Sequence, residues 1–155
     1  MAGTTNLDTK AGVAPALQAR RLSGLRRASL GALVMLVVQF GLGISVNLYT
    51  SLPAKGSAGD AFSNGPVLAL HVVVGLLLIV AAIGLLVRAI IARHGPVIAA
   101  AAVGLLAIAT AATQGFSFVS DGANAASLAM ALATGVAMLC YAIALYLVRA
   151  PAQRS

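Results

Sequence analysis

Four long apolar blocks constrain this chain more than any other feature of its sequence. They lie at residues 29–50, 66–88, 96–118 and 124–148. A helix needs about 20 apolar residues to cross the ~30 Å hydrocarbon core of a bilayer, and each block is close to that length. Turn residues such as Asn64 and Gly65 stand between the blocks. The sequence therefore predicts an all-α fold: an integral membrane four-helix bundle without β structure.

The composition supports a membrane protein and excludes an ordinary soluble domain. Hydrophobic residues make up 61% of the 155 residues and charged residues only 8%, whereas soluble domains carry about 25% charged residues. Ten Lys and Arg face three acids, for a net charge of +7. These cations flank the apolar blocks and form no stripe with aromatic residues. We therefore expect the lipid bilayer as partner, and no nucleic acid.

The positions of the cations predict the orientation of the helices. Nine of the ten Lys and Arg lie before the first block, at the end of the second block or just after it, or after the fourth; only Lys55 lies elsewhere. Since basic flanks stay in the cytoplasm, both termini should be cytoplasmic. The predicted organisation is a basic, largely disordered tail (1–28), the bundle (29–148) and a short cytoplasmic tail (149–155).

Polar and small residues recur at four-residue spacing within the blocks. Gln39, Gly43 and Asn47 share one face of the first block, and His71 and Gly75 share one face of the second. In lipid, small residues permit close helix contacts, and polar groups bond between helices. We therefore expect helix packing at Gly43 and Gly75. We also expect it on the alanine face of the fourth block, which includes Ala129 and Ala133 and suits a neighbouring helix or a homodimer.

The predicted topology brings several polar side chains toward the outer end of the bundle. This predicted polar pocket comprises Gln39, Asn47, His71, Gln114, Ser127 and Thr134. One interpretation is a hydrogen-bonded network that sets the register of the helices. The other is an outward-open pocket for a ligand, cofactor or partner helix, with His71 as the ionisable group inside the membrane.

The sequence offers no catalytic constellation and no metal site. His94 lies 23 residues after His71, or roughly 35 Å along a helix, so the two cannot share one ion or haem. Cys140 is the only cysteine, and no acid lies inside the predicted helices. Without a partnered nucleophile or a carboxylate pair, we predict no catalytic residue and no enzyme that works by side chains alone.

Two segments carry a resemblance to known membrane proteins. The segments "LVVQFGLGISVNLY" and "LALHVVVGLLLIVAAIGLL" resemble small four-helix membrane proteins of high-GC Gram-positive bacteria. The resemblance to bacterial proteins implies a bacterial plasma membrane as the location. More distantly, the two segments are similar to haem-A-synthase and cytochrome-b561-like bundles. That resemblance implies a haem held by His71, with Gly75 four positions on. Those bundles use histidines on more than one helix, and the fourth block here has none. A single ligand, a site shared across a dimer, or a bundle without haem remain as alternatives.

Three functions fit these observations. The first is a non-catalytic accessory, assembly or structural membrane component that contacts other membrane proteins or a second copy. The second is a haem-associated or quinone-associated redox protein that uses His71. The third is a small-solute carrier lined by Gln39, Asn47, His71 and Gln114, although no helix is broken by Gly or Pro as in many transporters.

Overall fold

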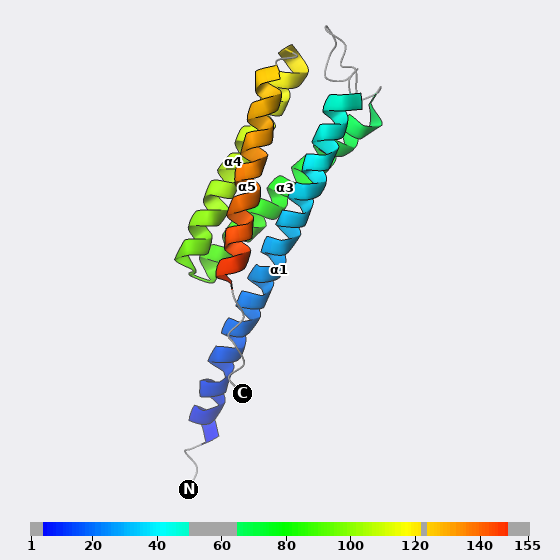
Figure 1. Cartoon of the computed structure of the whole chain (residues 1–155). Helices are drawn as coiled ribbons and strands as arrows, with labels where there is room; N and C mark the ends of the chain where they lie inside the picture. The colour runs from blue at the N-terminus through cyan, green and yellow to red at the C-terminus, as the bar shows by residue number, and fades with distance from the viewer. Residues whose placement is uncertain (1–4, 50–64, 122–123, 149–155) are drawn as a thin grey trace.

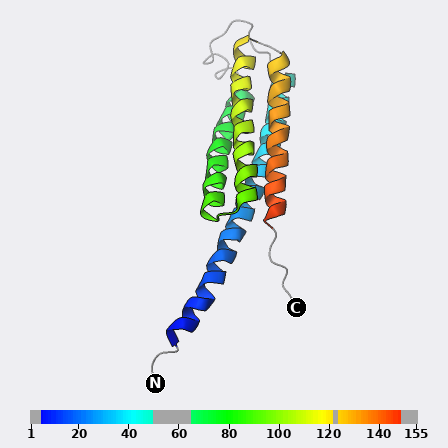
Figure 2. The same cartoon turned by 90° about the vertical axis from the view of Figure 1, so that its left-hand side faces the viewer.

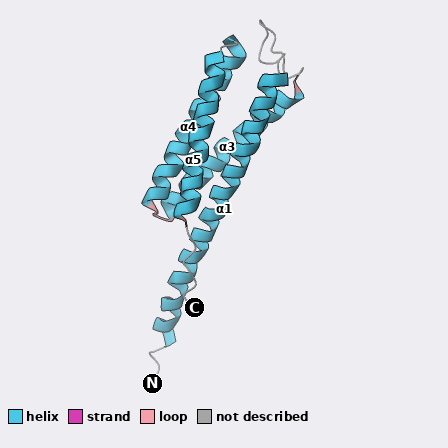
Figure 3. Cartoon of the chain, viewed as in Figure 1, coloured by secondary structure: helices cyan, strands magenta, loops and turns pink. Residues whose placement is uncertain are grey.

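The described structure is entirely helical apart from its turns. A computed structural model describes residues 5–49, 65–121 and 124–148. They form four helices (Figure 1): α1 (Thr5–Tyr49), α3 (Pro66–Ile91), α4 (Gly95–Asp121) and α5 (Asn124–Leu147). No strand occurs in these three ranges (Figure 3). The predicted all-α four-helix bundle is confirmed.

The helices form a ring in which sequence neighbours are antiparallel. α1 packs on α3 and α5, and α4 packs on the same two helices (Figures 1 and 2). The apolar spans are Leu17–Tyr49, Pro66–Ile91, Gly95–Val119 and Ala125–Leu147. Each is long and apolar enough to cross a bilayer. The chain is therefore a multi-pass membrane protein.

Two names locate features along the bundle. The turn end is the end that carries residues 92–94, between α3 and α4. The far end is the opposite one, where α1 ends and α3 begins. At the far end, Pro66 occupies the first turn of α3, where a missing N–H leaves no bond unmade. The start of α1 and the end of α5 both lie on the turn-end side of the bundle (Figure 1), which is the arrangement that an even number of spans requires.

α1 is longer than the sequence predicted. A largely disordered tail was expected through residue 28, but α1 is helical from Thr5 and projects beyond the turn end (Figure 1). Residues 16–28 are rich in Ala, Leu and Arg, which are good helix formers. Within them Leu25 is only 1% exposed and joins the core. Helix propensity and packing therefore continue the first span beyond the apolar block. The predicted tail 149–155 lies outside the described residues.

The buried core occupies the turn-end half of the bundle. Leu36, Leu85, Val97 and Tyr141 are among its members, and all four helices contribute to it. Toward the far end, a separate buried cluster pairs Val46 of α1 with Leu68 of α3. Many large apolar side chains are exposed, as a lipid-facing surface requires. The continuous core therefore anchors the helices at one end.

The α3–α4 turn ends α3 with a left-handed residue. Arg93 has a φ of 52°. Its backbone N–H donates to the carbonyl of Ile90 at 3.0 Å, and that of His94 donates to the carbonyl of Ala89 at 3.3 Å. This is the bonding of a Schellman motif, in which glycine usually takes the left-handed position. The motif places Arg93 and His94 next to each other at the turn end.

Candidate functional site

A polar pair crosses the contact between α1 and α3. Nε2 of the Gln39 side chain lies 3.3 Å from Nε2 of His71. In this orientation the amide donates, so the imidazole Nε2 accepts and the ring proton resides on Nδ1. Both side chains are half-buried. Two residues that the sequence placed in one polar pocket are thus in direct contact.

Each member of this pair lies against a glycine of the other helix. A Cβ added at Gly75 would lie 2.8 Å from Nε2 of Gln39, and one added at Gly43 would lie 3.2 Å from Cε1 of His71. The two helices are antiparallel, so Gln39 faces Gly75 while Gly43 faces His71. We call these four residues the α1–α3 lock. Both glycines predicted to serve helix packing lie at this close contact.

Two polar atoms of the lock are buried and have no hydrogen-bond partner among the described residues. They are Oε1 of Gln39 and Nδ1 of His71. With the ring proton on Nδ1, the lock retains one unused donor and one unused acceptor. A water molecule could satisfy both kinds of group.

A second polar pair joins α1 to α5 at the far end. The hydroxyl of Ser127 donates to Oδ1 of Asn47 at 3.5 Å, and Asn47 is exposed. Asn47 lies eight residues after Gln39, or about 12 Å along the α1 axis. The second pair is therefore separate from the lock.

The remaining two members of the predicted pocket join neither pair. Thr134 is buried, and its hydroxyl donates to the carbonyl of Met130 in its own helix at 2.8 Å. Gln114 is half-buried on α4, and no hydrogen bond links it to the other five residues of that pocket within the part of the chain described. The structure thus brings four of the six predicted pocket residues together, as two separate helix contacts.

The contact between α4 and α5 contains a pairing that the sequence did not predict. The ring of Tyr141 packs on Gly104, where an added Cβ would lie 2.8 Å from Cε1 and 2.9 Å from Cζ. Tyr141 is 0% exposed. Gly104 and Tyr141 each lie on a face of small or polar residues in the sequence. This pattern indicates that each face packs against another helix, but it does not indicate which residue lies opposite. The predicted packing residues Ala129 and Ala133 are half-buried on α5, and Ala137, further along the same face, is in the core.

The lock does not fit a haem as its side chains are placed. Nε2 of His71 is engaged by Gln39, and Nδ1 is buried. An iron atom could reach Nε2 only if the Gln39 amide moved away. His94 lies beyond the opposite end of α3, and the described residues hold no group of three metal-ligating side chains. Single-ligand binding by His71 would therefore need a different α1–α3 contact.

The comparisons with known proteins add no family assignment. No protein-family model matches this chain, and no curated protein or solved structure is significantly similar to it.

Proposed function

We propose that this multi-pass membrane protein is a non-catalytic accessory, assembly or structural component of its membrane, and that its intramembrane histidine serves helix packing. The main support for this proposal is the α1–α3 lock. In the lock His71 and Gln39 are hydrogen-bonded to each other, and each lies against a glycine of the opposite helix. A side chain that serves a substrate or cofactor needs a polar atom directed at open space. In the lock the engaged nitrogens face a neighbouring helix.

Other polar side chains support the same role. The hydroxyls of Ser29, Ser45 and Thr110 donate to carbonyls four residues earlier in their own helices. Such bonds satisfy a hydroxyl within the membrane without creating a binding site. Partners would meet the bundle through its exposed apolar faces. Another membrane protein or a second copy of the chain is our proposed partner, whereas the Ala129 and Ala133 face leads into the core at Ala137 and packs within the bundle.

The proposed location is a bacterial plasma membrane, with the turn end in the cytoplasm. The orientation is supported by the charge distribution, because the described cations all lie toward the turn end: Arg20, Arg21, Arg26, Arg27, Arg88 and Arg93. The described side chains at the far end carry neither Lys nor Arg. The positive-inside rule assigns the basic side to the cytoplasm.

A double-mutant cycle tests the packing role. Gln39→Ala, His71→Ala and the double variant would be unfolded reversibly in detergent micelles, with His94→Ala as the histidine control. We expect each lock variant to lower the free energy of unfolding, and the pair to be coupled by about 0.6 kcal/mol and at most about 2 kcal/mol. Strictly additive losses would show that the two side chains do not act together and would overturn the lock.

An absorption spectrum tests the redox alternative. The protein would be purified from a haem-replete host, and oxidised and dithionite-reduced spectra would be compared between the natural chain and His71→Ala. We expect no stoichiometric Soret band in either. A band that is present in the natural chain and lost in His71→Ala would identify a haem protein and replace the non-catalytic function proposed here.

A further inference from the structure

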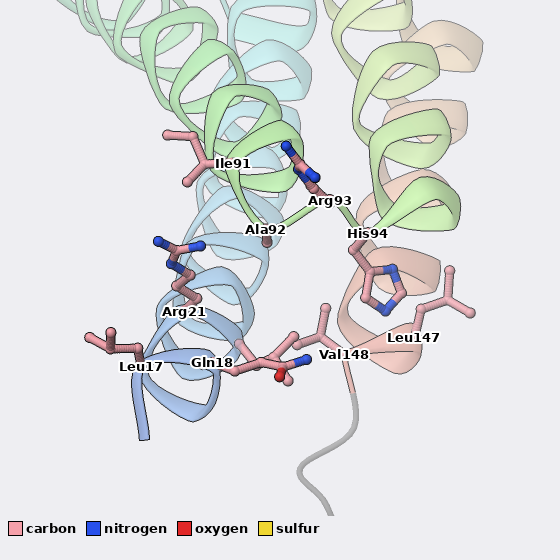
Figure 4. Close-up of a pocket in the computed structure, with 10 residues that line it drawn as sticks. Leu17, Gln18, Arg21, Ile91, Ala92, Arg93, His94, Leu147 and Val148 are labelled. Carbon is pink, nitrogen blue, oxygen red and sulfur yellow. The ribbon is translucent and has the colours of Figure 1, made fainter. Parts of the chain in front are cut away.

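An open groove of about 680 Å³ lies at the turn end of the bundle. Three elements line it (Figure 4): the N-terminal part of α1, the turn after α3, and the end of α5. It is far from the lock, because His71 lies near the opposite end of α3. The role proposed for the lock does not use this groove.

The polar lining of the groove is cationic. Arg21 comes from α1 and Arg93 from the turn, so two arginines from separate elements line one groove. His94 and Gln18 add further hydrogen-bonding groups, and Figure 4 shows the His94 ring directed toward the end of α5. Nδ1 of His94 is buried without a partner among the described residues. The described side chains include no Asp or Glu, so none of them neutralises the arginines.

The remaining lining is apolar and faces outward. Leu17, Ile91 and Leu147 line the groove and are exposed. A ligand that fills this space would therefore meet cationic groups and apolar walls together. A free phosphate could bind only to the cationic groups. A phospholipid carries a phosphate for the cationic groups and hydrocarbon for the apolar walls in the same molecule.

The groove also lies at the depth where a lipid headgroup resides. α3 has 26 residues, or about 39 Å, which exceeds the ~30 Å hydrocarbon core. Its last residue, Ile91, precedes Arg93 by two positions. On α3 the apolar wall thus ends next to a cation, as the acyl chains of a phospholipid end at its headgroup. Basic pockets between membrane helices are known sites for anionic headgroups.

We propose that this groove binds one anionic phospholipid of the surrounding leaflet, with its phosphate between Arg21 and Arg93 and an acyl chain against Ile91. Arg21 and Arg93 supply the charge, and the guanidinium fork matches phosphate geometry. Binding of this lipid would tie α1, the α3–α4 turn and α5 together at the turn end. The site depends on the bundle spanning a bilayer and is independent of the role proposed for the lock.

The test uses the full chain in nanodiscs made of phosphatidylcholine with a minor fraction of phosphatidylglycerol. Native mass spectrometry would measure how many phosphatidylglycerol molecules the protein retains. The groove variant carries Arg21→Gln and Arg93→Gln. The matched control carries Arg20→Gln and Arg88→Gln, which removes the same charge from two arginines that do not line the groove.

We expect the natural chain to retain one phosphatidylglycerol in preference to phosphatidylcholine. The groove variant should lose affinity by at least about 25-fold, since each direct hydrogen bond to a charged phosphate contributes at least about fivefold. The control should stay within about threefold of the natural chain. A third variant, with Arg21→Lys and Arg93→Lys, should keep most of the binding. Circular dichroism would verify that every variant is folded.

Several outcomes would overturn this site. Equal losses in the groove and control variants would indicate diffuse attraction to the basic end of the bundle. Retention of both lipids in their bulk ratio would show that no selective site exists. Displacement of the lipid by millimolar inorganic phosphate would show that the groove takes phosphate alone, without a use for its apolar wall.

Discussion

Nε2 of Gln39 lies 3.3 Å from Nε2 of His71, and each of these side chains lies over a glycine of the other's helix. The relationship is reciprocal, because α1 and α3 are antiparallel and both carry a polar residue followed four positions later by glycine. Gln39 precedes Gly43, and His71 precedes Gly75. The two glycines provide the space that two polar side chains need to bond between closely packed helices.

Substitution of Gly75 tests how tightly the lock is packed. In Gly75→Ala the new Cβ would lie 2.8 Å from Nε2 of Gln39, so the amide must move and its bond to His71 should be lost. We expect the free energy of unfolding in detergent to fall by about 1 kcal/mol relative to Gly84→Ala. Gly84 is the matched control because an added Cβ there meets nothing within 4 Å. Equal stability of the two variants would show that the contact is loose.

Substitution of Gly104 should cost more than substitution of Gly75. In Gly104→Ala the added Cβ would lie 2.8 Å from the ring of Tyr141. Because this ring is fully buried, it cannot move aside, whereas the end of the flexible Gln39 side chain can. Overpacking of this kind costs about 1–3 kcal/mol. The control is Gly135→Ala on α5, where a Cβ meets nothing within 4 Å. Thermal unfolding in detergent would measure both, and a Gly104→Ala variant as stable as the control would contradict the α4–α5 contact described here.

Substitution of Arg93 should stabilise the chain. Arg93 adopts a left-handed φ of 52°, which costs a non-glycine residue about 1 kcal/mol, so Arg93→Gly should raise the free energy of unfolding by that amount. Arg93→Ala keeps the unfavourable conformation and should change stability by less than about 0.5 kcal/mol. Chemical denaturation in detergent would distinguish them. If both variants behaved alike, the left-handed turn would not be the source of the effect. In the lipid assay Arg93→Gly should weaken binding while stabilising the fold.

Thiol labelling tests the predicted orientation. In a Cys140→Ser background, Tyr49→Cys places a thiol at an exposed position of the far end, and Ser23→Cys places one at an exposed position of α1 toward the turn end. An impermeant maleimide added to intact cells should label the first thiol at least about tenfold faster than the second, because a charged reagent does not cross the bilayer. Lysis should make the second reactive. The opposite pattern would invert the topology and place the groove in the outer leaflet.

The far end and the turn end of the bundle differ in how their helices are held together. The continuous core and the cationic groove lie toward the turn end. Toward the far end the buried apolar cluster is limited to Val46 and Leu68, and polar pairs connect α1 to α3 and α5. The polar contacts therefore act where apolar burial is least. For this reason the lock variants should weaken the far end while the core stays packed.

Much of the fold could be predicted because its signals are local. Span length, turn residues and the position of Pro66 follow from hydropathy and backbone chemistry within one segment, and the structure has helices where the apolar blocks lie. The four-residue spacing of Gln39 with Gly43, and of His71 with Gly75, likewise needs only helix geometry. The continuation of α1 back to Thr5 was missed, because the residues before the first apolar block have no long apolar run that would reveal a helix.

The sequence by itself determined the number of spans, their polar faces and the asymmetry of charge between the two ends. The tertiary structure decided which faces meet. Gln39 could have bonded to Gln114 or Thr134 on pattern alone, yet the ring order places α3 beside α1, and their register sets Gln39 opposite Gly75. The groove arises in the same way, since Arg21 and Arg93 are 72 residues apart and line one groove only because the N-terminal part of α1 passes the α3–α4 turn and the end of α5. Register and ring order depend on the packing of all four helices at once, and no single segment encodes them.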